Sequence, residues 1–260
     1  MNASTSFVKS LLAQCCLGGI CEWVVCPGAR NMALLQVLAA AEDLVQWTHF
    51  DERSAAFFAL GRIQDMGLPA AVVTTSGTAA AELLPAVVEA YYQRRPLLLL
   101  TADRPADYRG SAAPQAIEQA DMFGIYAPTI DLQTPDDLPE DILEDWDYAS
   151  PLHINVCLPD PDPTWNPGHC DLYPAEPPEE NKFRGSLSGL AQALRFKARH
   201  GLVLMLGGLD PTEQAPALWL ASELKAPVVA DATSGLREEL DHLALTDADR
   251  LLKQNPPAVL

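Results

Sequence analysis

The sequence predicts an α/β protein with a parallel sheet, followed by part of a second, Rossmann-like α/β domain. Short runs rich in valine, leucine and isoleucine alternate with longer stretches of helical periodicity, as in βαβ units. Several of the short runs are apolar at every position, which is expected when helices cover both faces of a sheet. A proline-rich segment separates two such α/β regions.

The first 158 residues contain the elements of one complete domain, which we assign to residues 1–158. Strands are expected at 23–26, 45–49, 70–74, 97–101 and 152–157, because each is a short β-branched or leucine-rich run. Helices are expected at 7–17, 32–41, 53–66, 78–93 and 136–148, where apolar residues recur at helical spacing.

The segment 159–185 is expected to be a linker, because it begins with PDPDPTWNPGHCDLYPAEPP and proline lacks the N–H that regular ladders need. Beyond it, predicted helices at 187–199 and 213–224 and predicted strands at 202–206 and 227–231 begin a central domain over 186–260. The last residues, NPPAVL, are typical of the start of a further strand, so this domain is expected to be truncated.

Composition and charge narrow the class of protein. No run approaches the roughly 20 apolar residues of a membrane span, and the N-terminus lacks the order of a secretion signal, so a cytoplasmic protein is expected. The formal net charge of -18 repels phosphate backbones and anionic lipid, so neither nucleic acid nor a membrane is expected as a partner. The six cysteines form no C-x-x-C pair, which favours reduced thiols, and no metal ligand is predicted.

Four polar motifs directly follow predicted strands, namely CPGARN, DER, TSGT and ADRP. The carboxyl ends of parallel strands meet at one edge of a sheet, and ligands of open α/β sheets bind at that edge. The convergence of four such motifs therefore predicts a ligand site there.

Glu52 of the DER motif shares a helical face with apolar residues. The spacing places it in line with Ala55, Ala56, Ala59, Ile63 and Met66. Desolvation on this face would favour the protonated carboxyl and allow proton exchange near neutral pH, although the helix N-terminus acts in the opposite direction. The alternative is a first-turn acid favoured by the helix dipole, next to a helix cap at Asp51.

The other motifs also leave two interpretations open. Gly77 would allow a close approach of backbone to a ligand, or it would belong to an ordinary strand-to-helix turn capped by Ser76 or Thr78. Arg30 and Arg104 could each bind a carboxylate through two N–H groups, or could be solvated surface residues. Gln115 lies in a polar loop, where it could donate to an anion or cap the next helix.

The motifs CPGARNMAL, THFDERSAAFFALG, VVTTSGTAAAELLPAVVEA, LLLLTADRPAD and PQAIEQADMFG, in this order, resemble the N-terminal pyrimidine-binding domain of thiamine-diphosphate enzymes. Within them, the motifs are most similar to the MenD family, the 2-succinyl-5-enolpyruvyl-6-hydroxy-3-cyclohexene-1-carboxylate synthases of menaquinone biosynthesis. LVLMLGGLD and PVVADATSGLR are similar to the central domain of that family, so the resemblance covers most of the chain.

The resemblance implies a transferase that uses thiamine diphosphate with Mg2+, or manganese in its place. Such an enzyme decarboxylates 2-oxoglutarate and adds the succinyl-semialdehyde carbanion to isochorismate. The glutamate that matches Glu52 would share a proton with the aminopyrimidine ring of the cofactor. Pro27, Ser76 and Gly77 would border the pyrimidine pocket, and Arg30, Arg104 and Gln115 would bind substrate carboxylates.

The sequence departs from the family in two places. Ala29 stands where the family commonly has the serine of PGSRS or PGSRN, so one hydroxyl is missing. No G-D-G followed by a distant asparagine is present, and that element holds the metal and the diphosphate in a C-terminal domain of the family. The family shares each active site between subunits, so the resemblance implies a homodimer or homotetramer at full length and an inactive chain on its own.

Two alternatives remain open from the sequence. The chain could be the front half of an acetolactate-synthase-like enzyme or a 2-oxoacid decarboxylase, which would keep Glu52 but need neither Arg30 nor Arg104. It could also be a non-catalytic α/β module that binds an anionic metabolite or a partner and uses Glu52 only as a helix-start acid.

Overall fold

The computed structural model describes residues 3–175, 194, 196 and 201–254. The chain divides into two compact units, Met1–Pro177 and Pro178–Leu260, and each is described by itself. The domain boundaries expected from the sequence, at residues 158 and 186, stay predictions.

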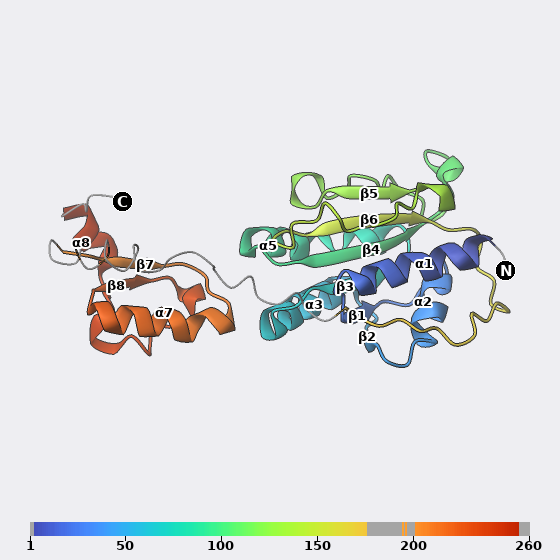
Figure 1. Ribbon diagram of the computed structural model, residues 1–260. Helices are drawn as coiled ribbons and strands as arrows, with labels where there is room; N and C mark the ends of the chain where they lie inside the picture. Colours follow the sequence, from blue (N-terminus) through green and yellow to red (C-terminus); the bar gives the residue numbers. More distant parts are fainter. Residues whose placement is uncertain (1–2, 176–193, 195, 197–200, 255–260) are drawn as a thin grey trace. The chain divides into compact units, whose positions relative to one another are not determined.

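The first unit contains a six-stranded sheet in which every pair of neighbours is parallel (Figure 1). The strands are β1 (Glu22–Val25), β2 (Val45–Thr48), β3 (Ala70–Thr74), β4 (Leu97–Asp103), β5 (Thr129–Leu132) and β6 (Leu152–Cys157). Their order across the sheet is β2-β1-β3-β4-β6-β5. The predicted α/β class with a parallel sheet is confirmed.

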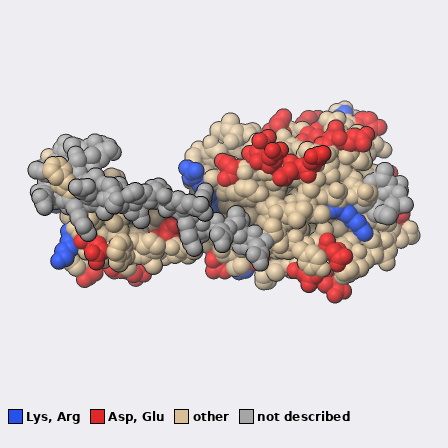
Figure 2. All heavy atoms as spheres, viewed as in Figure 1, with Lys and Arg blue, Asp and Glu red and all other residues tan. Residues whose placement is uncertain are grey.

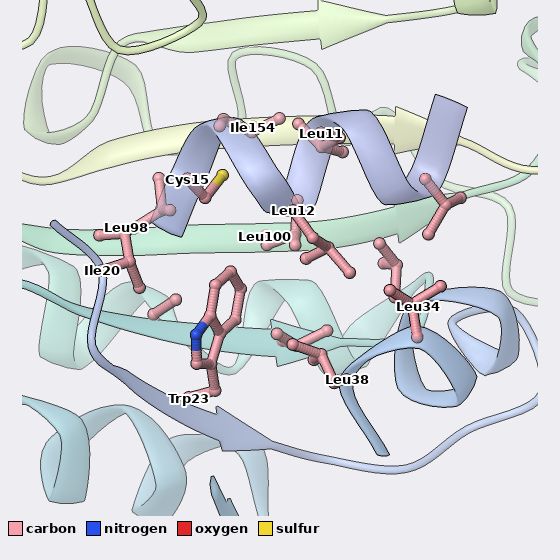
Figure 3. Packing of buried hydrophobic residues seen from close by; sticks show 14 of the residues in the cluster. Leu11, Leu12, Cys15, Ile20, Trp23, Leu34, Leu38, Leu98, Leu100 and Ile154 are labelled. Atoms are coloured by element: carbon pink, nitrogen blue, oxygen red, sulfur yellow. The ribbon is translucent and has the colours of Figure 1, made fainter. Parts of the chain in front are cut away.

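One face of the sheet is covered by α1 (Ala3–Leu17) and α2 (Met32–Ala39). Figure 3 shows how their side chains meet those of the strands, with Leu12 and Leu38 directed toward the fully buried Trp23. On β4, Leu98 and Leu100 belong to the same cluster. This face therefore holds the larger of the two cores in the first unit.

The opposite face is covered by α3 (Glu52–Met66) and α5 (Leu84–Gln93). Alanines such as Ala56 and Ala90 form much of this contact, and small side chains allow helices to approach the sheet closely. Leu97 and Leu99 of β4 point to this side because side chains along a strand alternate between faces. With both faces covered, β3 and β4 are buried at every position, which explains why their sequences are mainly apolar and polar only toward their carboxyl ends.

The strand order reverses between β1 and β3. From β1 the chain passes outward to β2 through α2, whereas from β3 it passes in the other direction to β4 through α5. Because α2 and α5 cover opposite faces, the chain continues from β1 and from β3 to opposite sides of the sheet. In open α/β sheets, such a switch point is where ligands bind.

The prediction of a helix at 136–148 is wrong. The structure has only the 3-10 turn Pro135–Asp137 there, followed by further turns. Asp137 accepts hydrogen bonds from the backbone N–H groups of Gln133 and Thr134, so this acid closes a turn instead of facing solvent on a helix. The apolar periodicity reflects three residues that pack into the first core, namely Ile142, Leu143 and Trp146.

Two smaller differences have a local cause. The single helix predicted at 78–93 is divided into α4 (Thr78–Ala81) and α5, because Pro85 has no N–H to continue the first helix and instead lies in the first turn of the second. The edge strand β5 was not expected, since its four residues, TIDL, are few and include a charged side chain. The remaining short elements are the 3-10 turns Ala106–Tyr108, Gly124–Tyr126, Ala232–Ser234 and Asp241–Leu243.

The described part of the segment predicted as a linker, residues 159–175, packs on the first unit. The carbonyl of Pro167 accepts a hydrogen bond from Lys9 Nζ at 2.7 Å, and the N–H of Ala175 donates to the carbonyl of Cys16 at 2.9 Å. Cys170 and Leu172 are buried in the core against α1 and α2. This stretch is therefore anchored along its length.

The second unit has a parallel pair of strands, β7 (Leu204–Leu206) and β8 (Val228–Ala230), connected through α7 (Pro211–Leu224). α7 begins with a capping box in which the Asp210 and Glu213 side chains satisfy each other's backbone N–H groups. A short helix, α8 (Ala248–Gln254), follows. The helix predicted at 187–199 lies almost entirely outside the described residues, and the possible strand at NPPAVL lies fully outside them.

Acidic side chains gather along the β5 edge of the first unit in the view of Figure 2. The turns between Asp136 and Asp147, next to β5 in the sequence, carry seven exposed acidic residues. Within the described part of the chain, no helix is long and apolar enough to cross a membrane. All six cysteines are free thiols.

The core against α1 and α2 predicts a clear difference between two leucine variants. Leu100→Ala removes a fully buried side chain and should lower the free energy of unfolding by about 2–5 kcal/mol. Leu17→Ala, at the exposed end of α1, should change it by less than about 0.5 kcal/mol. Urea denaturation of the two variants measures both values, and equal losses would contradict this packing.

Candidate functional site

The loop after β1 is closed by a buried asparagine. Asn31 Oδ1 accepts from the N–H of Gly28 and its Nδ2 donates to the carbonyl of Cys26, both at 2.9 Å. Gly28 lies directly against Thr75, because a Cβ on Gly28 would be 2.5 Å from the Thr75 Cβ. The N–H of Arg30 donates to Thr75 Oγ1 at 3.2 Å. The loops after β1 and β3 are therefore in contact at the carboxyl edge.

The side chain of Arg30 is buried and turned toward the end of β6. Its Nη1 donates to the carbonyls of Leu158 and Pro159 at 3.1 and 2.8 Å, and its Nη2 pairs with Asp160 at 3.0 Å. The guanidinium is thus already engaged by the segment after β6. A substrate carboxylate at Arg30 would have to compete with Asp160.

Gly77 after β3 lies against the loop that contains Gln115. Its φ of +80° belongs to the region that favours glycine, and a Cβ on it would be 3.1 Å from the Cα of Gln115. Next to Gln115, the carbonyl of Pro114 accepts a hydrogen bond from Arg104 Nε at 2.8 Å. The structure therefore brings Gly77, Arg104 and Gln115 together.

Pro27, Ser76 and Thr74 complete this part of the edge. Pro27 is exposed in the loop after β1, whereas Ser76 is almost fully buried beside Gly77. The hydroxyl of Thr74, at the end of β3, is buried and has no hydrogen-bond partner in the described structure. Three of the four predicted loops thus meet around β1, β3 and β4.

Glu52 is the first residue of α3 and is partly buried. Burial first, and then the negative charges of Glu52 and Asp51, raise the pKa of the Cys26 thiol, just after β1, to about 12. The predicted apolar face below it is present at Ala55, Ala56, Ala59 and Ile63, all buried. The exception is Met66, which is 47% exposed, because the helix ends there and leaves the sheet.

Asp51 has the capping role that the alternative interpretation gave it. Its carboxylate accepts from the N–H of Ser54 at 2.7 Å, and hydrogen bonding first to the Ser54 side chain and then to this N–H lowers the pKa of Asp51. Asp51 therefore pairs a free N–H group at the start of the helix. Among the described residues, no side chain or backbone group donates a hydrogen bond to the Glu52 carboxylate. Asp51 is thus engaged in the helix cap, whereas the Glu52 carboxylate is left for a ligand.

Comparison with known proteins indicates the family that this chain resembles. Residues 6–122 match the family model described as "Thiamine pyrophosphate enzyme, N-terminal TPP binding domain". A 2-succinyl-5-enolpyruvyl-6-hydroxy-3-cyclohexene-1-carboxylate synthase from Akkermansia muciniphila is 88% identical over 260 residues, which are 100% of this chain and 49% of that protein. The chain belongs to this MenD family of thiamine-pyrophosphate enzymes.

More distant relatives bear the same name. Synthases from Geobacillus thermodenitrificans and Bdellovibrio bacteriovorus are 38% and 36% identical over 91% and 86% of this chain, and over 44% and 42% of their own lengths. The chain thus spans about half the length of the curated relatives it matches. In fold, it is similar to an X-ray structure of a candidate thiamin diphosphate-dependent enzyme from Mycobacterium smegmatis, with a TM-score of 0.61, 19% identity, and coverage of 86% of this chain and 44% of that one.

A buried polar network lies on the sheet beneath the site and was not predicted. Asn155 of β6 is its centre: its Nδ2 donates to Asp103 and Asp131, and its Oδ1 accepts from Thr101 and from Gln119. Gln119 was part of the quoted motif PQAIEQADMFG, but its partners come from other strands. Only the pairing of β4 with β6 reveals them, so spacing in the sequence could not.

Two residues of this network carry large pKa shifts. His153 lies between the hydroxyls of Thr101 and Thr129, at 2.8 and 2.9 Å, and its burial lowers its pKa to about 3. Burial would raise the pKa of Asp131, but hydrogen bonds led by that from Arg109 lower it to about 2. Folding therefore keeps the histidine neutral and the carboxylate charged.

Gly77 should tolerate no side chain. Gly77→Ala places a methyl group against Gln115 and forces a φ of +80° on alanine, so it should lower the free energy of unfolding by about 1–3 kcal/mol. The matched control is Gly61→Ala in the middle of α3, where nothing lies within 4 Å of the new methyl group and stability should rise by about 0.5–1 kcal/mol. Urea denaturation compares the two, and a stabilised Gly77 variant would refute the close contact.

The neutral His153 predicts a pH dependence of stability. The unfolded chain takes up a proton at this histidine below a pH of about 6.5, whereas the folded protein does so only near 3. The contribution of His153 is therefore complete above 6.5 and is lost as the pH falls toward 3. Urea denaturation between pH 7 and 4 should show a flatter pH dependence for His153→Asn than for the unaltered chain or for His242→Asn, which changes an exposed histidine. Parallel curves for all three would exclude a neutral buried His153.

Proposed function

We propose that this chain supplies the N-terminal, pyrimidine-binding half of the active site of 2-succinyl-5-enolpyruvyl-6-hydroxy-3-cyclohexene-1-carboxylate synthase. The proposed reaction joins the four-carbon remnant of decarboxylated 2-oxoglutarate to isochorismate in menaquinone biosynthesis. The observation that carries the proposal is the position of Glu52, a partly buried acid that starts α3 after β2 at the carboxyl edge of the sheet, in a chain 88% identical to such a synthase.

The residues at this edge fit the pyrimidine end of thiamine diphosphate. Glu52 offers a partly buried carboxyl above an alanine-rich face, and Gly77 presents no side chain. The hydroxyl of Thr74 is buried there without a partner, as expected of a group near a polar ligand. Pro27, Ser76 and Gly77 would border the ring in this assignment.

The chain's own residues would act by holding a proton and by orienting the substrates. Thiamine diphosphate, when bound, supplies the electron sink for decarboxylation of a 2-oxoacid. Glu52 would exchange a proton with a nitrogen of the pyrimidine ring, and its apolar surroundings would strengthen that hydrogen bond. Arg104 and Gln115, which lie together, would bind a substrate carboxylate, and Arg30 would bind another after Asp160 is displaced.

The resemblance to the family implies that the metal and diphosphate ends of the cofactor bind to another domain. Among the described residues, no group of three or more His, Cys, Asp or Glu side chains could hold a metal ion. We assign Mg2+, or manganese, and the diphosphate to such a domain, provided by another subunit of a cytoplasmic homodimer or homotetramer. In this assignment the 260-residue chain alone is inactive.

The role of Glu52 is tested in the complete enzyme that contains this sequence. Glu52→Gln should reduce product formation from 2-oxoglutarate and isochorismate by about 100-fold or more, since an amide cannot exchange the proton. Asp51→Asn is the matched control: it removes the neighbouring charge but keeps an N-cap side chain, so activity should stay within about threefold.

Two results would contradict the proposal. Activity of Glu52→Gln within twofold of the unaltered enzyme would exclude the proton exchange and favour a non-catalytic α/β module. Turnover of pyruvate alone, with no use of 2-oxoglutarate and isochorismate, would assign the chain to an acetolactate-synthase-like enzyme or a decarboxylase instead.

A further inference from the structure

Gln119 is a fully buried amide that touches three segments of the site. Its Oε1 accepts from the N–H of Gly77 at 2.7 Å. Its Nε2 donates to the carbonyl of Ala102 at 3.2 Å and to Asn155 Oδ1 at 2.9 Å. Since a buried amide is costly unless its polar atoms are paired, these contacts hold the side chain in one orientation.

The two carboxylates of the network, Asp103 and Asp131, determine which groups donate and which accept in these hydrogen bonds. Asp103 and Asp131 are acceptors when ionised, and Arg109 pairs with both carboxylates. Asn155 must therefore turn its Nδ2 toward them, and its Oδ1 faces Gln119. Gln119 in turn must present its Nε2 to Asn155 and its Oε1 to Gly77.

The contacts of Gln119 link the predicted cofactor loop to the predicted substrate residues. The N–H of Gly77 donates to Gln119, and the Cα of Gly77 faces Gln115. Gln115 precedes Gln119 by four residues in the same loop. The carbonyl of Ala102, the second contact, is two residues before Arg104 on the same strand end. One side chain thus determines how the loop after β3 lies relative to the loop after β4.

We propose that Gln119 is a positioning residue, which holds the Gly77 peptide in the orientation that receives the pyrimidine ring and aligns it with Arg104 and Gln115. This inference rests on the proposed function. The Gly77 N–H donates to Gln119 and is therefore not available to a ligand. The contribution of Gly77 is instead the absence of a side chain, which leaves space for the pyrimidine ring. Gln119 itself lies below the site and acts through Gly77.

A glutamine is required here because the position needs one acceptor and two donors. Glutamate has the same shape, but a carboxylate would set a charged oxygen against the oxygens of Ala102 and Asn155. Burial and these facing oxygens favour the protonated carboxyl, which restores one donor. A Gln119→Glu variant should therefore recover part of the function as the pH falls.

The experiment uses the complete enzyme and measures the affinity for thiamine diphosphate with Mg2+ present. Gln119→Met, which fills the space but makes no hydrogen bond, should weaken this affinity about tenfold at pH 8. Gln119→Glu should weaken it similarly at pH 8 and less at pH 6. The control is Thr129→Val, which removes the hydrogen bond to His153 elsewhere in the network and should leave the affinity unchanged.

A second measurement does not depend on the cofactor. In the 260-residue chain, hydrogen exchange of the Gly77 amide should be faster in Gln119→Met than in Thr129→Val. Equal exchange rates would overturn the inference, as would an unchanged cofactor affinity in both Gln119 variants while the unaltered enzyme binds and turns over. If the unaltered enzyme binds no thiamine diphosphate, the proposed function fails and this inference fails with it.

Discussion

The burial of both faces of the parallel sheet is the constraint on which the site depends. Helices cover β3 and β4 on each side and bury every residue of these strands, so their polar groups can meet a ligand only at the strand ends. Because α2 and α5 run to opposite faces, the ends of β1 and β3 form a switch point, which is where open α/β sheets bind ligands. The chemistry of the chain is therefore confined to one edge by the same packing that stabilises it.

Irregular loops at such an edge need support, and buried amides provide it. Asn31 closes the loop after β1 and Gln119 holds the loop after β3, each through hydrogen bonds to backbone. The net gain from each bond is only about 0.5–1.5 kcal/mol, but a buried backbone group left unpaired costs about 1–3 kcal/mol. These amides thus act mainly by excluding other loop conformations.

The sequence was a good guide to the sheet and to the motifs at its edge, and a poor one to contacts between distant segments. Apolar runs predicted the strands because two-sided burial leaves a clear pattern, whereas the short edge strand β5 has no such pattern. The helix expected at 136–148 failed because Asp137 bonds to nearby backbone, an option that periodicity does not report. The partners of Gln119 and Arg30 depend on strand order, which local spacing does not contain.

The two arginines of the edge differ in what holds them, and this difference suits separate roles. Two backbone carbonyls orient the Arg30 guanidinium without neutralising it, and among the described residues only Asp160, which is 83% exposed, balances its charge. Because Asp160 lies in solvent, an anionic ligand could take its place at the buried guanidinium while the carbonyls preserve the orientation. Arg104 instead rests on Tyr108 and the Pro114 carbonyl, and its Nη atoms have no partner among the described residues. In a chain of net charge -18, such positioned guanidinium groups would offset the repulsion that an anionic ligand meets.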